Sequence, residues 1–209
     1  MEQKAEEIMN LLKENYPEAD TFLRYQNCYQ FLVAVILSAR STDEQVNRVS
    51  KGLFQKYPNV FELAEASPEE VAEVIKGCGL YRSKSSSLIK MARTLVLEYG
   101  GKIPSDWNKL LSLPGVGRKT ASLVWATLFG FPAFPVDTHV FRVARRLGLS
   151  RGEKVEEVEK ELKECFPSRE WLPLHHRLIL HGRKLCYAKQ PHCEKCFLQG
   201  HCVFLLKQS

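Results

Sequence analysis

Apolar residues along this 209-residue chain recur at the three- to four-residue spacing of amphipathic helices, and glycine, proline and polar residues separate these runs. We find no stretch with the alternating pattern of a β-strand, and no internal repeat. The run FLVAVILSA, residues 31–39, is apolar on every side, which is typical of a helix buried in a core. The pattern predicts an all-α fold, with helices near residues 3–15, 28–39, 43–56, 60–66, 69–76, 83–99, 105–111, 117–129, 138–147, 153–164 and 170–184.

Local signals mark where two of these helices begin. Ser67 followed by Glu70 is the signature of a capping box, in which each residue hydrogen-bonds the backbone of the other. Thr42 or Asp43 can cap the helix predicted over residues 43–56. The connections between helices are short, so a second domain would form by the chain crossing back rather than on a flexible tether.

The composition is that of a globular protein inside the cell. A hydrophobic content of 44% is enough for a sizeable core, and a net charge of +6 is compatible with a polyanionic partner without proving one. The N-terminus has the charged pattern of an amphipathic helix, and the longest wholly apolar run, residues 31–37, is too short to cross a bilayer. We therefore expect a cytoplasmic protein, associated with the nucleoid if the source is prokaryotic.

A glycine turn, Pro114-Gly115-Val116-Gly117, separates the helices predicted over residues 105–111 and 117–129. Backbone N–H groups at the start of the second helix, together with its dipole, suit a phosphate oxygen. The two glycines permit unusual backbone angles and a close approach to a ligand. A bare GxG is more often a simple helix connector, but LPGVGRKTA anchors both helices with apolar residues and favours a phosphate site.

Lys119 has an unfavourable position, because a cation in the first turn of a helix faces the positive end of the dipole. This placement favours the neutral amine, which can act as a nucleophile and form a Schiff base. A solvated lysine that contacts phosphate is the alternative, and the local sequence does not choose between the two.

The chain is able to bring Asp137 back to Lys119. A helix over residues 117–129 is about 20 Å long, and the connector over residues 130–136 can span roughly 23 Å when extended. Asp137 is also a natural N-cap for the helix predicted over residues 138–147. A carboxylate beside Lys119 could stabilise positive charge on a sugar ring or transfer protons.

Four of the seven cysteines lie close together near the C-terminal end, with the spacing of a metal site: Cys186, Cys193, Cys196 and Cys202. In an intracellular chain, such a cluster around a C-x-x-C favours a metal over disulfides. The spacing alone allows either zinc or an iron–sulfur cluster. The loop between the first two ligands carries Lys189, which could present a cation to a phosphate.

Together these motifs resemble the endonuclease III family of DNA base-excision glycosylases, the helix–hairpin–helix Gly/Pro-Asp type. The resemblance covers nearly the whole chain and rests on the cysteine spacing and on LSARSTD (37–43), GLYRSK (79–84), LPGVGRKTA (113–121), VDTHVFRV (136–143) and HHRLILHGR (175–183). It implies two helical domains flanking a DNA-binding cleft. One is a helical barrel with the hairpin, residues 21–131, and the other is a cluster domain formed by residues 1–20 and 132–209.

The resemblance implies a bifunctional DNA glycosylase and AP lyase that removes oxidised pyrimidines and cuts the strand by β-elimination. By motif position, Lys119 is the Schiff-base nucleophile and Asp137 the catalytic carboxylate. The four cysteines are implied to hold a [4Fe-4S] cluster. The implied partner is double-stranded DNA with a damaged base or an abasic site, and we expect the protein to be a monomer.

Further DNA contacts are implied by the same motifs. Arg40 and Leu80 would fill the space left by a flipped base, and Arg40 departs from the family, which often has glutamine there. The remaining implied contacts are the hairpin residues Gly115, Val116 and Gly117, with His139 and Lys189 on phosphates. The histidines at positions 175, 176 and 181 are expected to be structural.

Three alternatives share part of this pattern. A monofunctional mismatch glycosylase would keep the hairpin and the aspartate but typically has serine or tyrosine in place of Lys119. A non-catalytic helix–hairpin–helix DNA-binding protein needs neither Lys119 nor Asp137. A zinc-stabilised scaffold would keep the cysteines alone. The presence of both Lys119 and Asp137 favours the bifunctional enzyme.

Overall fold

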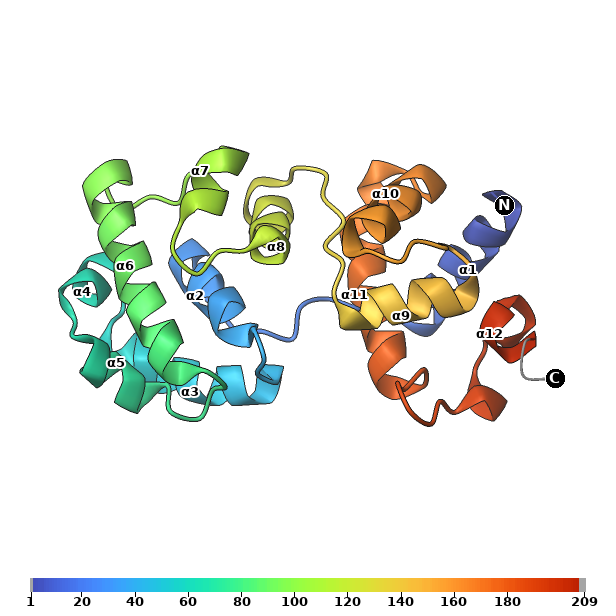
Figure 1. The fold of residues 1–209 in the computed structure, drawn as a ribbon, viewed down its shortest axis with the longest axis horizontal. Helices are drawn as coiled ribbons and strands as arrows, with labels where there is room; N and C mark the ends of the chain where they lie inside the picture. Colours follow the sequence, from blue (N-terminus) through green and yellow to red (C-terminus); the bar gives the residue numbers. More distant parts are fainter. Residues whose placement is uncertain (1, 207–209) are drawn as a thin grey trace. The chain divides into compact units, whose positions relative to one another are not determined.

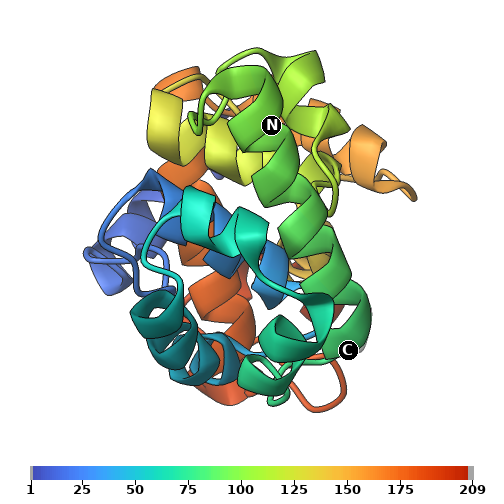
Figure 2. The ribbon, with the colours of Figure 1, turned by 90° about the vertical axis from the view of Figure 1, so that its left-hand side faces the viewer.

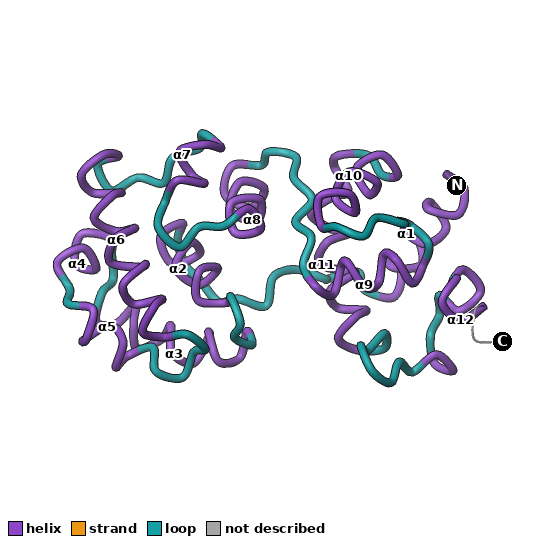
Figure 3. Tube along the Cα trace, in the orientation of Figure 1, coloured by secondary structure: helices purple, strands orange, loops and turns teal. Residues whose placement is uncertain are grey.

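The computed structural model describes residues 2–206 (Figure 1). Over these residues it consists of α-helices, short 3₁₀ turns and loops, with no strand (Figure 3), which confirms the predicted all-α class. The chain divides into two compact units, of which one spans Phe22–Phe129 and the other combines the residues up to Thr21 with those from Gly130 onward. No helix in the described range is long and apolar enough to cross a membrane.

The unit Phe22–Phe129 is built around α2, which contacts α3, α6 and α8 and lies between α6 and α8 in Figure 1. Residues 30–37 of α2 are all buried, so the prediction of a central buried helix is confirmed. The helices of this unit are α2 (Cys28–Ser38), α3 (Asp43–Lys56), α4 (Val60–Glu65), α5 (Pro68–Val74), α6 (Tyr81–Tyr99), α7 (Trp107–Ser112) and α8 (Arg118–Phe129).

The long helix α6 organises the outer part of this unit. It packs against α4 and α5, and Figure 2 shows it in green beside these two teal helices. Leu88, Met91 and Leu95 form its buried face. The buried face begins in the first turn of α6, with Lys84 and Ser85, close to the turn that precedes the helix.

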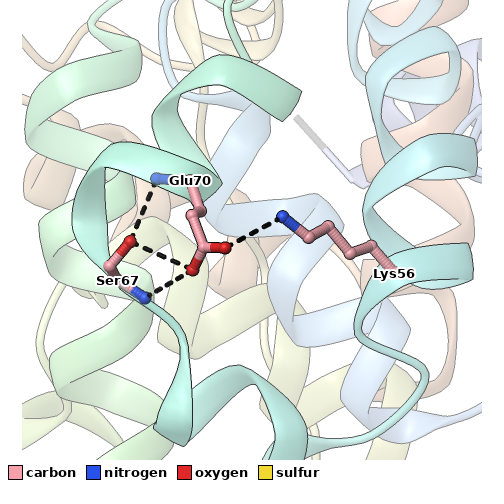
Figure 4. Close-up of polar contacts among 3 residues, drawn as sticks. All are labelled: Lys56, Ser67 and Glu70. Carbon is pink, nitrogen blue, oxygen red and sulfur yellow. Dashed lines mark hydrogen bonds and ion pairs between the residues drawn. The ribbon is translucent and has the colours of Figure 1, made fainter.

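The cap of α5 is the predicted capping box (Figure 4). Ser67 Oγ accepts from the N–H of Glu70 at 3.3 Å, and Glu70 Oε2 accepts from the N–H of Ser67 at 3.3 Å. Lys56 at the end of α3 adds a contact to Glu70 Oε1 at 3.4 Å. The N–H and hydroxyl of Ser67, followed by Lys56, hold the pKa of Glu70 below its usual range. At α3 the cap is Thr42, again with a capping box, rather than Asp43.

The other unit joins the N-terminal helix to the last third of the chain. Its core includes Ile8 and Leu12 of α1, Val143 of α9, Leu162 of α10 and Leu178 of α11, all fully buried. The helices of this unit are α1 (Glu2–Asn15), α9 (Thr138–Leu147), α10 (Val155–Cys165), α11 (Trp171–Lys184) and α12 (Val203–Leu206).

Several helix ends differ from the prediction by one or two residues, for local reasons. α7 begins at Trp107 rather than residue 105, because the Asp106 side chain accepts from the N–H of Lys109 at 2.9 Å and caps it. α6 begins at Tyr81 rather than residue 83, since Leu80 adopts a left-handed conformation just before it. Short turns at Cys193–Lys195 and Gln199–His201, and helix α12, were not predicted.

Candidate functional site

The glycine turn between α7 and α8 depends on Gly115. Its φ of 83° is left-handed, and a Cβ there would lie 3.1 Å from the Cβ of Ser87 and 3.4 Å from Cγ2 of Ile36. Both the backbone angle and the packing therefore require glycine. Val116 is buried, and its N–H donates to the carbonyl of Leu113 at 3.0 Å. Val116 thus anchors the turn through its side chain and its N–H.

Gly117 does not use the unusual backbone angles that glycine permits. Its φ is not left-handed, and a Cβ at this position would meet nothing within 4 Å. The left-handed turn is therefore made by Gly115, and the proposed close approach of a ligand to Gly117 stays a prediction. Gly117 is the residue before α8, and its carbonyl accepts from the N–H of Ala121 at 2.8 Å. It has no side chain with which to cap the helix, so this helix start is sterically accessible.

Lys119 is exposed in the first turn of α8, as predicted, beside the N–H groups that have no acceptor within the helix. The N-terminal end of a helix, where the dipole is positive and N–H groups are free, is a suitable place for an anion. Phosphate contact and nucleophilic attack are therefore both open to an amine at this position.

Asp137 is the N-cap of α9, as predicted. Its Oδ1 accepts from the N–H of His139 at 2.9 Å and from the N–H of Val140 at 2.8 Å. The residues before it, 133–136, are buried, and His175 Nδ1 donates to the carbonyl of Pro135 at 2.6 Å. Asp137 therefore follows an anchored segment. It lies in a different compact unit from Lys119, so the predicted meeting of the two side chains stays a prediction.

His139 and the nearby histidines of α11 differ in exposure. His139 is partly buried, and burial lowers its pKa; Arg142 Nη2 lies 3.1 Å from its Nδ1. His175 and His181 are each 1% exposed and His176 is 8% exposed, which agrees with the structural role expected for them.

Arg40 and Leu80 have exposed side chains on backbone that is left-handed, with φ of 54° and 59°. This conformation costs a residue with a Cβ about 1–2 kcal/mol. Leu80 is 56% exposed, so it is not a core leucine. Both residues therefore sit on strained turns, a feature that the sequence did not indicate.

The four cysteines line one hollow, so their spacing does bring them together, and their role as metal ligands stays a prediction. No group of described His, Cys, Asp or Glu side chains is arranged to hold a single metal ion. Arg146 Nη1 donates to Cys186 Sγ at 3.4 Å, and His181 Nε2 lies 3.6 Å from Cys196 Sγ. Burial raises the pKa of the Cys196 thiol, so N–H groups beside the sulfurs would help to stabilise thiolates there.

Arg146 also holds the loop between the first two cysteines. It donates to the carbonyl of Tyr187 at 2.6 Å and to that of Ala188 at 2.9 Å. Lys189 follows directly and is exposed. The loop is therefore tied down next to Lys189, through an arginine that the sequence analysis had left without a role.

Lys84 is the other functional candidate that the sequence analysis missed. It is 6% exposed, and its Nζ donates to the carbonyl of Leu37 at 2.7 Å and to Ser41 Oγ at 2.9 Å. No pattern in the sequence marks a lysine as buried, since lysine is rarely found inside proteins.

Comparisons with known proteins extend over both compact units. A family model described as HhH-GPD superfamily base excision DNA repair protein matches residues 33–168. The chain is 44% identical over 195 residues to endonuclease III of Bacillus subtilis, covering 93% of this chain and 89% of that protein. It is 40% identical over 198 residues to endonuclease III of Escherichia coli strain K12, covering 95% of this chain and 94% of that protein.

Solved structures of DNA repair proteins are also similar to this chain. The structure of a trapped endonuclease III–DNA covalent intermediate matches with a TM-score of 0.95 at 40% identity, over 100% of this chain and 98% of that chain. A thermostable thymine-DNA glycosylase shares the fold, with a TM-score of 0.83 at 24% identity over 98% of each chain.

Proposed function

Because the chain belongs to the endonuclease III family of HhH-GPD base excision DNA repair proteins, as its motifs predict, we propose that it is a bifunctional DNA glycosylase and AP lyase. We propose oxidised pyrimidines in duplex DNA as its substrates. One observation carries the proposal: Lys119 is exposed in the first turn of α8, directly after a glycine turn whose last residue has no side chain. A monofunctional or non-catalytic relative would not need an amine there.

The hairpin would hold the DNA backbone. The first N–H groups of α8 point out of the helix end, and the helix dipole favours a phosphate oxygen beside them. Gly115 and Gly117 are both exposed, so a phosphate can approach the backbone closely. Lys189 on the loop held by Arg146, and His139 at the start of α9, are the proposed phosphate contacts of the other unit.

Lys119 would carry out the covalent chemistry as a neutral amine. Its nitrogen forms a bond to C1′ of the damaged nucleotide while the N-glycosidic bond breaks, and the base leaves with the electron pair and takes up a proton. The sugar ring then opens to an imine, which acidifies the hydrogens on C2′. Loss of a C2′ proton breaks the C3′–O bond, so the strand is cut on the 3′ side of the lesion.

Asp137 would stabilise positive charge on the sugar and transfer protons during these steps. Its cap on α9 supports this role, because two backbone N–H groups fix one of its oxygens at 2.8 and 2.9 Å. A side chain that is held in one place loses no conformational freedom when the substrate arrives.

Arg40 and Leu80 would occupy the space that a flipped base leaves in the duplex. The exposure of the two side chains supports this role, because both lie on turns of one unit and neither is buried in its core. Arginine at position 40 has enough donors to hydrogen-bond the base opposite the lesion.

We propose a [4Fe-4S] cluster as the group held by Cys186, Cys193, Cys196 and Cys202. The support is their position, since all four line one hollow in which N–H groups of Arg146 and His181 lie beside two of the sulfurs. When bound, the cluster would cross-link the C-terminal loops as a structural element. A broad visible absorption of the purified protein is expected, and a colourless protein that contains zinc would contradict this assignment.

Borohydride trapping tests the main proposal. Borohydride reduces an imine to a stable amine, so the protein should become covalently attached to a duplex that contains an oxidised pyrimidine. Lys119→Ala should abolish the adduct and lower strand cleavage by ~10³-fold or more, because the nucleophile is gone. Lys102→Ala, which removes another exposed lysine of the same unit, is the matched control.

The trapping assay also separates the alternatives. Base removal without an adduct would indicate a monofunctional glycosylase, and DNA binding without base removal would indicate a non-catalytic protein. Full trapping by Lys119→Ala would show that another amine is the nucleophile. A panel of lesions and opposite bases ranks the substrates.

A further inference from the structure

Lys84 is a buried lysine that none of the proposed steps uses. It lies in the first turn of α6, and its Nζ donates to the carbonyl of Leu37 at 2.7 Å and to Ser41 Oγ at 2.9 Å. Burial lowers its pKa, which reflects the cost of holding an ammonium group away from water. A charged side chain in such a place requires a structural or functional reason.

The carbonyl of Leu37 lies in the last turn of α2, where the final carbonyls have no donor within the helix. Helix α2 has no basic residue of its own in that turn. Lys84 supplies the cation from α6, and a cation at the C-terminal end of a helix is stabilised by the dipole. Lys84 therefore joins the end of α2 to the start of α6.

The hydroxyl of Ser41 extends this connection to the turn that precedes α6. Ser41 Oγ accepts from the N–H of Gly79 at 3.0 Å as well as from Lys84. The two turns also touch directly, since a Cβ at Gly79 would lie 2.4 Å from the carbonyl oxygen of Arg40. Lys84, Ser41 and Gly79 are thus joined by hydrogen bonds into one brace between the two turns.

The brace lies between the two strained positions of the unit. Within the described range, Arg40 and Leu80 are the residues other than glycine with a positive φ, at 54° and 59°. Arg40 immediately precedes Ser41, and Leu80 immediately follows Gly79. Strained backbone persists only where its surroundings hold it, and the brace provides those contacts.

We propose that Lys84 is a positioning residue, which locks the turns carrying Arg40 and Leu80 into one preorganised element for insertion into duplex DNA. The inference rests on the proposed function, because it assumes that these two side chains enter the duplex. Preorganisation means that the side chains need not be ordered during insertion, so more of the binding energy is available to unstack the bases. Without the brace, the two turns would insert independently.

Insertion is measured with 2-aminopurine placed opposite the lesion, because its fluorescence rises when it loses its stacking partners. Under saturating protein, Lys84→Met should at least halve the fluorescence change and lower the kcat of base removal about tenfold, with little change in KM. Lys90→Met, an exposed lysine on the same helix, should behave as wild type. Ser41→Ala removes one of the two acceptors of Lys84, and an intermediate loss of about threefold in kcat is expected.

A double mutant separates positioning from general stability. If Lys84 acts through the inserted leucine, Lys84→Met should lower kcat much less in a Leu80→Ala background than alone. An equal loss in both backgrounds, or wild-type insertion by Lys84→Met, would overturn the inference. If Lys84→Met does not fold, Ser41→Ala carries the same comparison, and wild-type insertion by that variant overturns the inference. Wild-type insertion by both Leu80→Ala and Arg40→Ala would instead contradict the insertion step of the proposed function.

Discussion

Helices α8 and α9 begin in opposite ways. α9 starts at an aspartate whose Oδ1 accepts from two backbone N–H groups at 2.8 and 2.9 Å, so its own carboxylate meets the positive end of the helix. α8 starts after Gly117, which has no side chain, and carries Arg118 and Lys119 in its first turn. One helix start is capped by the carboxylate of its own N-cap residue, and the other follows a residue that has no side chain with which to cap it.

This difference shows that stability and binding make opposite demands on a helix N-terminus. A cap such as Asp137 contributes about 1 kcal/mol to stability. Glycine before α8 gives up only a few tenths of a kcal/mol of that contribution, but Arg118 and Lys119 place two cations where the dipole disfavours them. This loss of stability is expected where an anion from another molecule binds the N–H groups at the start of the helix. We propose that a DNA phosphate does so at α8.

The largest effect is expected from changing the charge of Asp137 without removing its cap. Asparagine caps helices as well as aspartate does, so Asp137→Asn should leave the unfolding free energy within about 0.5 kcal/mol of wild type. Its kcat for base removal should fall by ~10²–10⁴-fold, because the carboxylate is lost. Denaturant unfolding and single-turnover kinetics measure the two quantities.

Asp137→Ala is the companion variant. It should lose activity to the same degree and also about 1 kcal/mol of stability, since alanine cannot cap. Wild-type activity in Asp137→Asn would show that the residue serves only as a cap.

A smaller effect is expected from giving α8 an N-cap aspartate like that of α9. Gly117→Asp introduces a cap without steric conflict, because a Cβ there meets nothing within 4 Å. Stability should stay the same or rise, while affinity for duplex DNA should fall about tenfold or more, because the new carboxylate competes with phosphate for the N–H groups. Fluorescence anisotropy at several salt concentrations measures the affinity.

Gly117→Ser supplies the uncharged control for this change. It should lower affinity less than Gly117→Asp, since it adds a cap but no negative charge. If Gly117→Asp binds DNA as tightly as wild type, the open start of α8 is not the phosphate site.

The smallest effect concerns the turn that presents α8. Gly115→Ala places a Cβ on left-handed backbone and within 3.1 Å of Ser87, so a loss of about 1 kcal/mol in unfolding free energy is expected. Gly52→Ala is a suitable contrast: it lies within α3, its Cβ would meet Val74 at an ordinary 3.8 Å, and it should stabilise the helix. Equal stability of the two variants would mean that the turn tolerates a side chain.

Much of the candidate site was predictable from the chain alone. The cap at Asp137, the capping box at Ser67 and the hairpin before Lys119 all depend on residues within four positions of one another. The grouping of the four cysteines was also predictable, because they lie close together in the sequence around a C-x-x-C. The GxG pattern did not reveal that Gly115, and not Gly117, has the left-handed backbone.

Local sequence thus determined the helices, their caps and the residue types at the proposed site, because helical periodicity and capping are interactions between near neighbours. The tertiary structure decided which polar residues became buried partners. Lys84 contacts residues 43 and 47 positions away, and Arg146 reaches Cys186 across 40 positions. The left-handed backbone at Arg40 and Leu80 was also decided by the tertiary structure. Neither residue type favours that conformation, and the contacts of Ser41 and Gly79 that hold it exist only once the helices have packed.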